Sequence, residues 1–538
     1  MDLGSVGRTH PSCSPGRDLS MATFSFTQNL GHITDYGLTF FPERPALLQD
    51  GMSLTYRELD ERINRVAQGL LAQGLREQDR VLILWEGDIR FVEVVLGVIR
   101  AGGIAVPVNS QLSMEKHREL LDDAGTRYVL ASAVTAATAV AFHVEGLVGF
   151  AAGVGSQHDG VPDYEEWLAD QADERPDIRL DVDAVAWQPY TSGSTGVPKG
   201  VLISHRMLLR NAQQVSSAMF IEPSDRVIVS TPLFHMNASA VGLLPCLAAG
   251  ASAYVLPGFD AKSVLAGIEE QKCTYITGVP AMYKMLLGEE EQIARRDLSS
   301  LRMILCGSAP MPPALLDELK TVFPRATFSE GYGLTECGPV ATLVPRMGVR
   351  KLGSIGMPFP DVEVRIVDDV GRALSSGQTG ELWLRSKCTA LGYHRRPEET
   401  AKRFKDGGWF ATGDLVMADE DGWLYFRGRA DDMMSVGGEN VYPAEVEAVL
   451  AQHPKVRDVC VVSMPHEIKG EVPVSFVVLH EGCELDETEL RDFFLERGPA
   501  FAHPRRITIL PTMPLSGTGK VDRRELARRA VEPVQQDA

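Results

Sequence analysis

The chain has 538 residues, too many for one ordinary hydrophobic core, so we expect more than one domain. Apolar residues make up 44% and charged residues 23%, which is typical of a globular protein with a packed interior. The formal net charge of −19 disfavours adhesion to nucleic acids or anionic lipid, so we expect neither as a partner.

The N-terminal residues and the cysteines indicate the compartment. Residues 1–20 are polar, rich in Gly, Pro and Ser, and lack the apolar core of a signal peptide, so we expect a disordered extension. The eight cysteines form no CxxC pair, which favours reduced thiols in a cytoplasmic protein. The Ala-rich stretch 133–155 contains His143 and Glu145, so it predicts a helix and a strand rather than a transmembrane segment.

From about residue 50 to 260, short apolar runs alternate with longer helical patterns. Residues 55–74 carry apolar side chains at helical spacing and end on a glycine, whereas residues 80–85 form a continuous apolar run. A helix at 91–101 and a strand at 104–108 continue the alternation, which predicts parallel sheets covered by helices. A second round consists of a strand at 251–256, a helix at 261–271 and a strand at 275–277.

After about residue 350 the pattern changes to short strands separated by Gly and Asp turns. Three of them predict a small β-rich subdomain: 362–367, 380–385 and 422–427. A charged junction at 429–432 then precedes a compact α+β pattern, with helices at 444–452 and 487–497 and strands at 458–463, 473–479 and 506–510. We therefore predict an α/β fold with a large domain over 21–430 and a small mobile domain over 431–538.

The clearest motif is residues 190–200, read as YTSGSTGVPKG, which follow the strand-like run 185–187. Glycines let backbone N–H groups approach an anion, hydroxyls add donors, and a lysine supplies charge. The spacing differs from the GxxxxGK[ST] pattern, because Gly follows Lys199. The candidate phosphate-binding residues are Thr191, Ser192, Gly193, Ser194, Thr195, Gly196 and Lys199.

This string resembles the signature of the superfamily that contains acyl-CoA synthetases, peptide-synthetase adenylation domains and luciferases, over about residues 25–530. Residues 330–336, EGYGLTE, are similar to the second core motif of that superfamily. The resemblance implies that Tyr332 stacks on adenine, that Thr335 contacts the α-phosphate and that Glu336 binds Mg²⁺. A carboxylate beside phosphates suits Mg²⁺, which takes one or two carboxylates plus phosphate oxygens.

Three further segments resemble motifs of the same superfamily. Residues 307–310, GSAP, follow an apolar run and imply that Ser308, Ala309 and Pro310 lie beside adenine. In the run 412–414, Asp414 is implied to accept hydrogen bonds from ribose hydroxyls, and Arg429 to contact ribose or phosphate. The run 515–520, LSGTGK, ends on Lys520, which is implied to stabilise the transition state of adenylation.

The superfamily joins a carboxylic acid to a thiol in two steps in one cleft. The acid first attacks the α-phosphate of ATP, and a thiol then attacks the acyl-adenylate. The resemblance implies that the small domain rotates about Asp431 between these steps, and that Gly437 and Gly438 then line the tunnel for coenzyme A. A glycine pair at a tunnel wall leaves room for a thiol.

The acid-binding wall indicates the branch of the superfamily. At residues 234–235 this chain has Phe-His and no acid, which leaves the ammonium group of an amino acid unpaired and disfavours amino acids. His235 is implied to gate the acyl pocket. The predicted pocket is mostly small and apolar: Asn237, Gly307, Gly331, Gly333, Pro339 and Val340.

The sequence therefore predicts an acyl-CoA synthetase closest to the fatty acyl-CoA and coumarate-CoA type ligases, using ATP, Mg²⁺ and CoA. A monocarboxylic acid is expected, with fatty acids favoured and aryl acids second. Two alternatives stay open: an enzyme that loads an acyl group onto a carrier protein, and a binder without catalysis.

Overall fold

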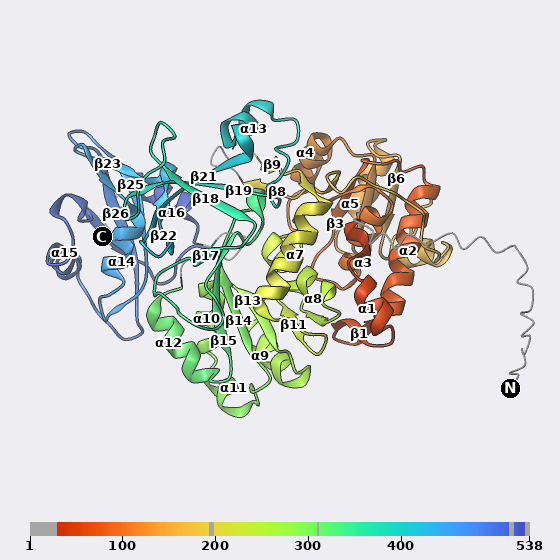
Figure 1. The fold of residues 1–538 in the computed structure, drawn as a ribbon, viewed down its shortest axis with the longest axis horizontal. Helices are drawn as coiled ribbons and strands as arrows, with labels where there is room; N and C mark the ends of the chain where they lie inside the picture. Colours follow the sequence, from red (N-terminus) through yellow and green to blue (C-terminus); the bar gives the residue numbers. More distant parts are fainter. Residues whose placement is uncertain (1–28, 193–197, 309–310, 516–520, 533–538) are drawn as a thin grey trace, which may run out of the picture.

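A computed structural model of the chain describes residues 29–192, 198–308, 311–515 and 521–532. Figure 1 shows the N-terminal elements, among them α2, α3 and β6, at one end of the molecule. The C-terminal elements, among them α15, β25 and β26, lie at the other end. Between them lie a large sheet with its helices and an antiparallel sheet above it.

The first sheet has six strands in the order β10-β7-β4-β3-β5-β6, parallel except for β10. On β3, Val81 and Ile83 pack against α2 and α3, whereas Leu82 and Leu84 pack against α4 and α5 on the opposite face. The strands are β3 (Arg80–Leu84), β4 (Ile104–Val108), β5 (Tyr128–Ala131), β6 (Phe150–Gly153), β7 (Val185–Trp187) and β10 (Ile203–Ser204). The helices are α1 (Asp35–Phe40), α2 (Tyr56–Ala72), α3 (Arg90–Arg100), α4 (Met114–Ala124), α5 (Ala136–Val144) and α6 (Tyr164–Ala169).

The second sheet has nine strands in the order β17-β16-β15-β14-β13-β11-β12-β1-β2. Its centre, from β15 to β1, is parallel, and antiparallel strands close both edges. The strands are β1 (Pro45–Gln49), β2 (Met52–Thr55), β11 (Arg226–Val229), β12 (Ser252–Val255), β13 (Tyr275–Gly278), β14 (Met303–Gly307), β15 (Thr327–Tyr332), β16 (Thr342–Leu343) and β17 (Met357–Pro358).

Helices cover both faces of this second sheet. One apolar cluster joins the sheet to α9, α10 and α12, and the largest cluster joins its other face to α7 and α8. These helices are α7 (His205–Met219), α8 (Leu244–Ala248), α9 (Ala261–Glu270), α10 (Pro280–Leu287), α11 (Glu290–Arg295) and α12 (Pro313–Val322). A π-helical segment, η2 (Asn237–Leu243), immediately precedes α8.

The β-rich part is an antiparallel sheet in the order β18-β19-β21-β20, with β22 also paired to β21. Its elements are β18 (Val362–Val367), β19 (Thr379–Ser386), α13 (Pro397–Arg403), β20 (Phe404–Lys405), β21 (Trp409–Ala418) and β22 (Leu424–Arg429). A separate hairpin is formed by β8 (Tyr190–Ser192) and β9 (Pro198–Gly200).

The C-terminal unit has its own sheet, in the order β24-β23-β26-β25 with β27 beside β26, and its own apolar cores. The strands are β23 (Met434–Val436), β24 (Glu439–Val441), β25 (Val456–His466), β26 (Gly470–Leu479) and β27 (Arg506–Ile509), and the helices are α14 (Pro443–Leu450), α15 (Glu487–Leu495) and α16 (Arg523–Val531). The predicted boundary at Asp431 falls in a short 3₁₀ helix, Ala430–Asp432, between this sheet and the preceding one.

The predicted fold class is confirmed: helix-covered parallel sheets, a β-rich subdomain and an α+β C-terminal unit. Helix α16 was not predicted, because Leu526 and Ala530 are its only buried residues and five of its nine residues are charged. The seven cysteines in the described part of the chain are all free thiols. Within the described residues, no helix combines the length and apolar character that crossing a membrane requires.

Candidate active site

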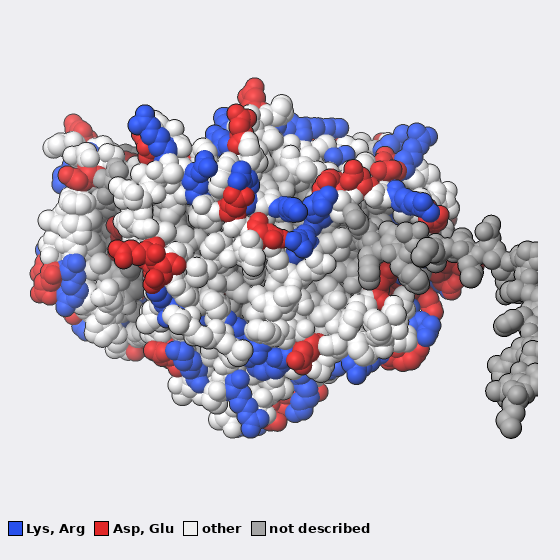
Figure 2. Space-filling view, in the orientation of Figure 1, with Lys and Arg blue, Asp and Glu red and all other residues white. Residues whose placement is uncertain are grey.

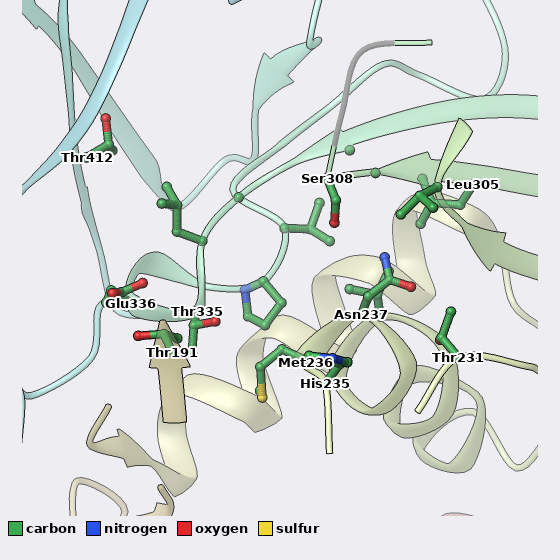
Figure 3. A pocket seen from close by; sticks show the side chains of 18 of the residues that line it. Thr191, Thr231, His235, Met236, Asn237, Leu305, Ser308, Thr335, Glu336 and Thr412 are labelled. Atoms are coloured by element: carbon green, nitrogen blue, oxygen red, sulfur yellow. The ribbon is translucent and has the colours of Figure 1, made fainter. Parts of the chain in front are cut away.

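A cavity of about 350 Å³ opens where the carboxyl ends of β13, β14 and β15 meet the β8–β9 hairpin and the antiparallel sheet. This is the edge of a parallel sheet at which ligands commonly bind. Figure 3 shows Thr191, Thr335 and Glu336 gathered on one side, and Asn237, Ser308 and Leu305 on the other. Thirteen predicted site residues line the cavity: Thr191, Lys199, His235, Asn237, Gly307, Ser308, Gly331, Gly333, Thr335, Glu336, Pro339, Val340 and Arg429.

The hairpin brings the two ends of the phosphate-binding motif together. Thr191 on β8 pairs directly with Lys199 on β9, and both residues line the cavity. Gly193, Ser194, Thr195 and Gly196 lie outside the described residues, and Ser192 is placed only as part of strand β8.

The Lys199 ammonium is held by partners far along the chain. Its Nζ donates to Glu399 Oε2 at 2.6 Å and lies 5.5 Å from the centre of the Tyr393 ring. The Tyr393 hydroxyl in turn donates to Glu336 Oε1 at 2.8 Å. A single network therefore links the motif lysine, an aromatic ring and the predicted magnesium ligand.

Glu336 is buried, with 9% of its surface exposed. Burial raises the pKa of its carboxyl, and the hydrogen bond from Tyr393 opposes that rise. The described residues hold no group of three or more His, Cys, Asp or Glu side chains arranged around a metal. One buried carboxylate beside hydroxyls and a phosphate-binding lysine suits Mg²⁺, which keeps phosphate oxygens and waters as its other ligands.

The ribose candidate Asp414 lies directly behind this wall, on β21. Its Oδ2 accepts a 2.6 Å hydrogen bond from the Tyr332 hydroxyl, and Arg429 Nε lies 3.1 Å from Oδ1. Burial raises the pKa of Asp414, opposed mainly by the charge of Arg429. Oδ1 is buried and its charge is paired with Arg429, and Asp414 does not itself line the cavity.

Close-packed backbone at Gly333 and the polar side chains of Asn237 and Ser308 also line the cavity. An ideal Cβ on Gly333 would lie 2.6 Å from the Gly338 carbonyl oxygen, so any larger residue must displace this turn. Asn237 begins the π-helical segment η2, a conformation that recurs at functional sites, and its Oδ1 accepts a hydrogen bond from Thr277 at 3.3 Å. Ser308 has a left-handed backbone, with φ of 67°.

Five predicted residues that the structure describes do not line the cavity: Tyr332, Asp414, Asp431, Gly437 and Gly438. Gly437 and Gly438 form an exposed turn between β23 and β24, and Asp431 is exposed, 3.9 Å from Arg403. Ala309, Pro310 and Lys520 lie outside the described residues. The roles of all these residues stay predictions.

Several cavity residues were missed by the sequence analysis: Thr231, Met236, Val241, Val279, Leu305, Tyr393, Arg403, Phe410 and Thr412. Tyr393 and Arg403 come from the β-rich part, about 200 residues after Lys199, and stand in no phosphate-binding pattern. Thr412 stands in the run that was used for Asp414, and Met236 stands between His235 and Asn237, so these two runs carried a usable signal.

Comparisons with known proteins show the family and the fold. A family model described as AMP-binding enzyme matches residues 38–394, and one described as AMP-binding enzyme C-terminal domain matches residues 445–520. Feruloyl-CoA synthase of an Amycolatopsis species is 34% identical, covering 91% of this chain and 96% of its own length. The fatty acid–[acyl-carrier-protein] ligase ScoC of Streptomyces coeruleorubidus is 32% identical, covering 93% and 96%.

Among solved structures, the anthranilate CoA ligase AuaEII in complex with anthranoyl-AMP superposes with a TM-score of 0.86 at 28% identity. That match covers 93% of this chain and 97% of the solved one.

Proposed function

The chain belongs to the AMP-binding family of adenylate-forming acyl-CoA ligases, which use ATP, Mg²⁺ and CoA, and we propose that its acid is a compact aryl monocarboxylate. The sequence alone favours aliphatic acids. The name of the feruloyl-CoA synthase relative supports the change of order.

In the first half-reaction, a carboxylate oxygen of the acid attacks the α-phosphorus of ATP. The bond to the pyrophosphate oxygen breaks, and acyl-AMP forms. We assign Thr191 and Lys199 to the phosphates, because they face each other on the hairpin at the cavity wall. Their N–H and O–H groups stabilise charge that builds on the phosphate oxygens. The motif residues 193–196 belong to the same proposed cradle.

Glu336 would hold Mg²⁺ together with phosphate oxygens, and Thr335 would donate to the α-phosphate. The ion, when bound, neutralises charge on the phosphates. Asp414 would accept from the ribose, and Arg429, whose Nε lies 3.1 Å from Asp414 Oδ1, would hold that carboxylate in place. Tyr332 would stack on adenine, beside Ser308, Ala309 and Pro310.

In the second half-reaction, the sulfur of CoA attacks the acyl carbon, the bond to AMP breaks, and the thiol proton passes to solvent. We assign Asp431 as the hinge of the domain rotation, Gly437 and Gly438 to the thiol tunnel, and Lys520 to the adenylation step. The exposed Gly437–Gly438 turn supports this sequence of events, because it stands away from the cavity and must travel to reach it.

The acid side of the cavity also supports an aryl acid. Val340, Leu305 and Met236 offer apolar contact to a ring, and Gly333 admits no side chain where a ring would approach the backbone. His235, whose ring centre lies 4.2 Å from that of Phe234, stands at the gate of this side.

The test is pyrophosphate release with ATP, Mg²⁺ and a panel of cinnamic, benzoic, medium-chain and long-chain acids, each with and without CoA. We expect the highest kcat/KM with an aryl acid, completed by acyl-CoA. A kcat/KM at least tenfold higher for a fatty acid, which corresponds to about 1.4 kcal/mol of discrimination, would contradict the aryl acid and favour an aliphatic one.

A carrier protein is a second candidate acceptor, because the ScoC relative is named as an acyl-carrier-protein ligase. Adenylate that forms with acid but does not pass to CoA would favour this acceptor. A cytoplasmic location belongs to the same proposal and is supported by the free thiols of the described cysteines.

A further inference from the structure

Glu399 stands beside the site without a role in the chemistry described above. It lies in the first turn of the short helix α13. Its carboxylate accepts hydrogen bonds from Lys199 Nζ at 2.6 Å and from Lys402 Nζ at 2.9 Å. The Lys199 side chain is only 13% exposed, which leaves its ammonium little freedom to turn towards solvent. Its ion pair with Glu399 therefore holds the ammonium along the cavity wall.

Hydrogen bonds connect helix α13 to Tyr393 and, through Asp123, to the start of the β8–β9 hairpin. Thr400 Oγ1 accepts the backbone N–H of Tyr393 at 3.0 Å and donates to the Arg396 carbonyl at 2.8 Å. Arg396 also donates to Asp123 Oδ1 at 2.6 Å, and Asp123 Oδ2 accepts the Tyr190 hydroxyl at 2.8 Å. The start of the β8–β9 hairpin and its lysine are therefore both tied to the segment that carries Glu399.

We propose that Glu399 is a positioning residue, which holds the Lys199 ammonium at the cavity wall where the phosphates of ATP bind. An ammonium group has three N–H donors, so one can remain on Glu399 while the others point to phosphate oxygens. The Tyr393 ring, 5.5 Å from Nζ, limits the direction in which the amine can turn.

The alternative effect of Glu399 is competition, in which its charge opposes the phosphates and occupies the lysine. The two effects have opposite signs. If Glu399 positions Lys199, its removal frees a long side chain that ATP must then order, and ATP binding weakens. If Glu399 competes, its removal strengthens ATP binding, because a negative charge disappears beside an anionic ligand.

The role of Glu399 rests on the proposed assignment of Lys199 to the phosphates, so its test measures MgATP binding without any acid. Calorimetric titration compares the wild-type protein with Glu399→Ala, Glu399→Gln and Glu398→Ala. Glu398 is an exposed neighbour on the same helix turn, so its variant removes the same charge without touching Lys199.

We expect Glu399→Ala to raise the Kd of MgATP about 3- to 10-fold, the cost of ordering one long side chain. Glu399→Gln keeps an acceptor for Lys199 and should stay within about twofold of wild type, as should Glu398→Ala. Thiolysis of supplied acyl-AMP should be unchanged in all variants, because that step no longer involves the triphosphate.

Unchanged or tighter MgATP binding in Glu399→Ala would overturn the proposal, and so would an equal loss in Glu398→Ala. Melting temperatures check that each variant is folded, and Glu399→Ser serves the same comparison if the Ala variant is not. A wild-type protein that binds MgATP but forms no adenylate with any acid would refute the proposed function and leave the test of Glu399 intact.

Discussion

The hydrogen bond from Tyr393 to Glu336 sets the pH range in which Glu336, the proposed magnesium ligand, is ionised. Burial raises the pKa of the Glu336 carboxyl, and the Tyr393 hydroxyl, at 2.8 Å, lowers it again. Tyr393→Phe removes this donor and keeps the ring that faces Lys199. The pKa of Glu336 must then rise, because a buried carboxylate has lost the group that stabilises its charged form.

The size of the effect follows from the burial of both groups, each less than 10% exposed. A hydrogen bond to a charged group contributes about 1.5–3 kcal/mol, and one pKa unit corresponds to about 1.4 kcal/mol, so the shift is about 1–2 units. The acid limb of kcat/KM for MgATP should move to higher pH by that amount. At pH values above the new limb, activity should return towards the wild-type level.

The assay is pyrophosphate release from pH 5 to 9 at limiting MgATP. Tyr254→Phe is a matched control, because the Tyr254 hydroxyl also donates to a carboxylate, Asp50, at 2.6 Å, away from the cavity. An acid limb that stays in place in Tyr393→Phe, or that moves equally in Tyr254→Phe, would refute the reasoning.

Three other changes have expected outcomes. Gly333→Ala should lower kcat/KM for the acid about fivefold or more, because its Cβ would lie 2.6 Å from the Gly338 carbonyl oxygen and overpacking costs about 1–3 kcal/mol. Acid-dependent pyrophosphate release measures this change, and an unchanged kcat/KM would contradict it. Glu336→Gln should abolish activity yet raise the melting temperature at neutral pH. The pKa of Glu336 is raised in the folded protein, so ionisation of this carboxyl destabilises the fold as pH rises above 4.5, the ordinary pKa of the group. The gain in melting temperature should vanish near pH 4, and a gain that persists there would contradict this explanation. Lys284 on α10 contacts the C-terminal unit, where it donates to the Arg457 carbonyl at 3.0 Å and pairs with Asp458. Lys284→Ala should change the ratio of the adenylation rate to the thiolysis rate by at most about fivefold, and Asp458→Ala should change it equally.

The sequence predicted the parts of the fold that depend on local patterns. Strand β3 and helix α3 were predicted within one or two residues, because a buried parallel strand and an amphipathic helix each leave a clear pattern. The pairing of β1 with β12 was not predictable, because nothing local in residues 45–49 specifies a partner about 200 residues later.

The site divides in the same way. Lys199 and Glu336 were predicted as site residues because each stands in a run of glycines and hydroxyl residues, and the structure places both at one cavity; their roles stay predictions. The contacts of Tyr393 and Glu399 with these two residues were not predictable, because they form only when the β-rich part folds against the β8–β9 hairpin. The acidic and basic side chains interspersed over the surface in Figure 2 show why a charged residue such as Glu399 does not stand out by charge alone.

The most direct test of the central claim is to incubate the protein with ATP, Mg²⁺ and its preferred acid, first without CoA and then with it. We predict that mass spectrometry detects acyl-AMP bound to the protein in the first stage, and acyl-CoA with free AMP in the second. Formation of ADP in place of AMP and pyrophosphate, or acyl-CoA without any acyl-AMP on the way, would contradict the account.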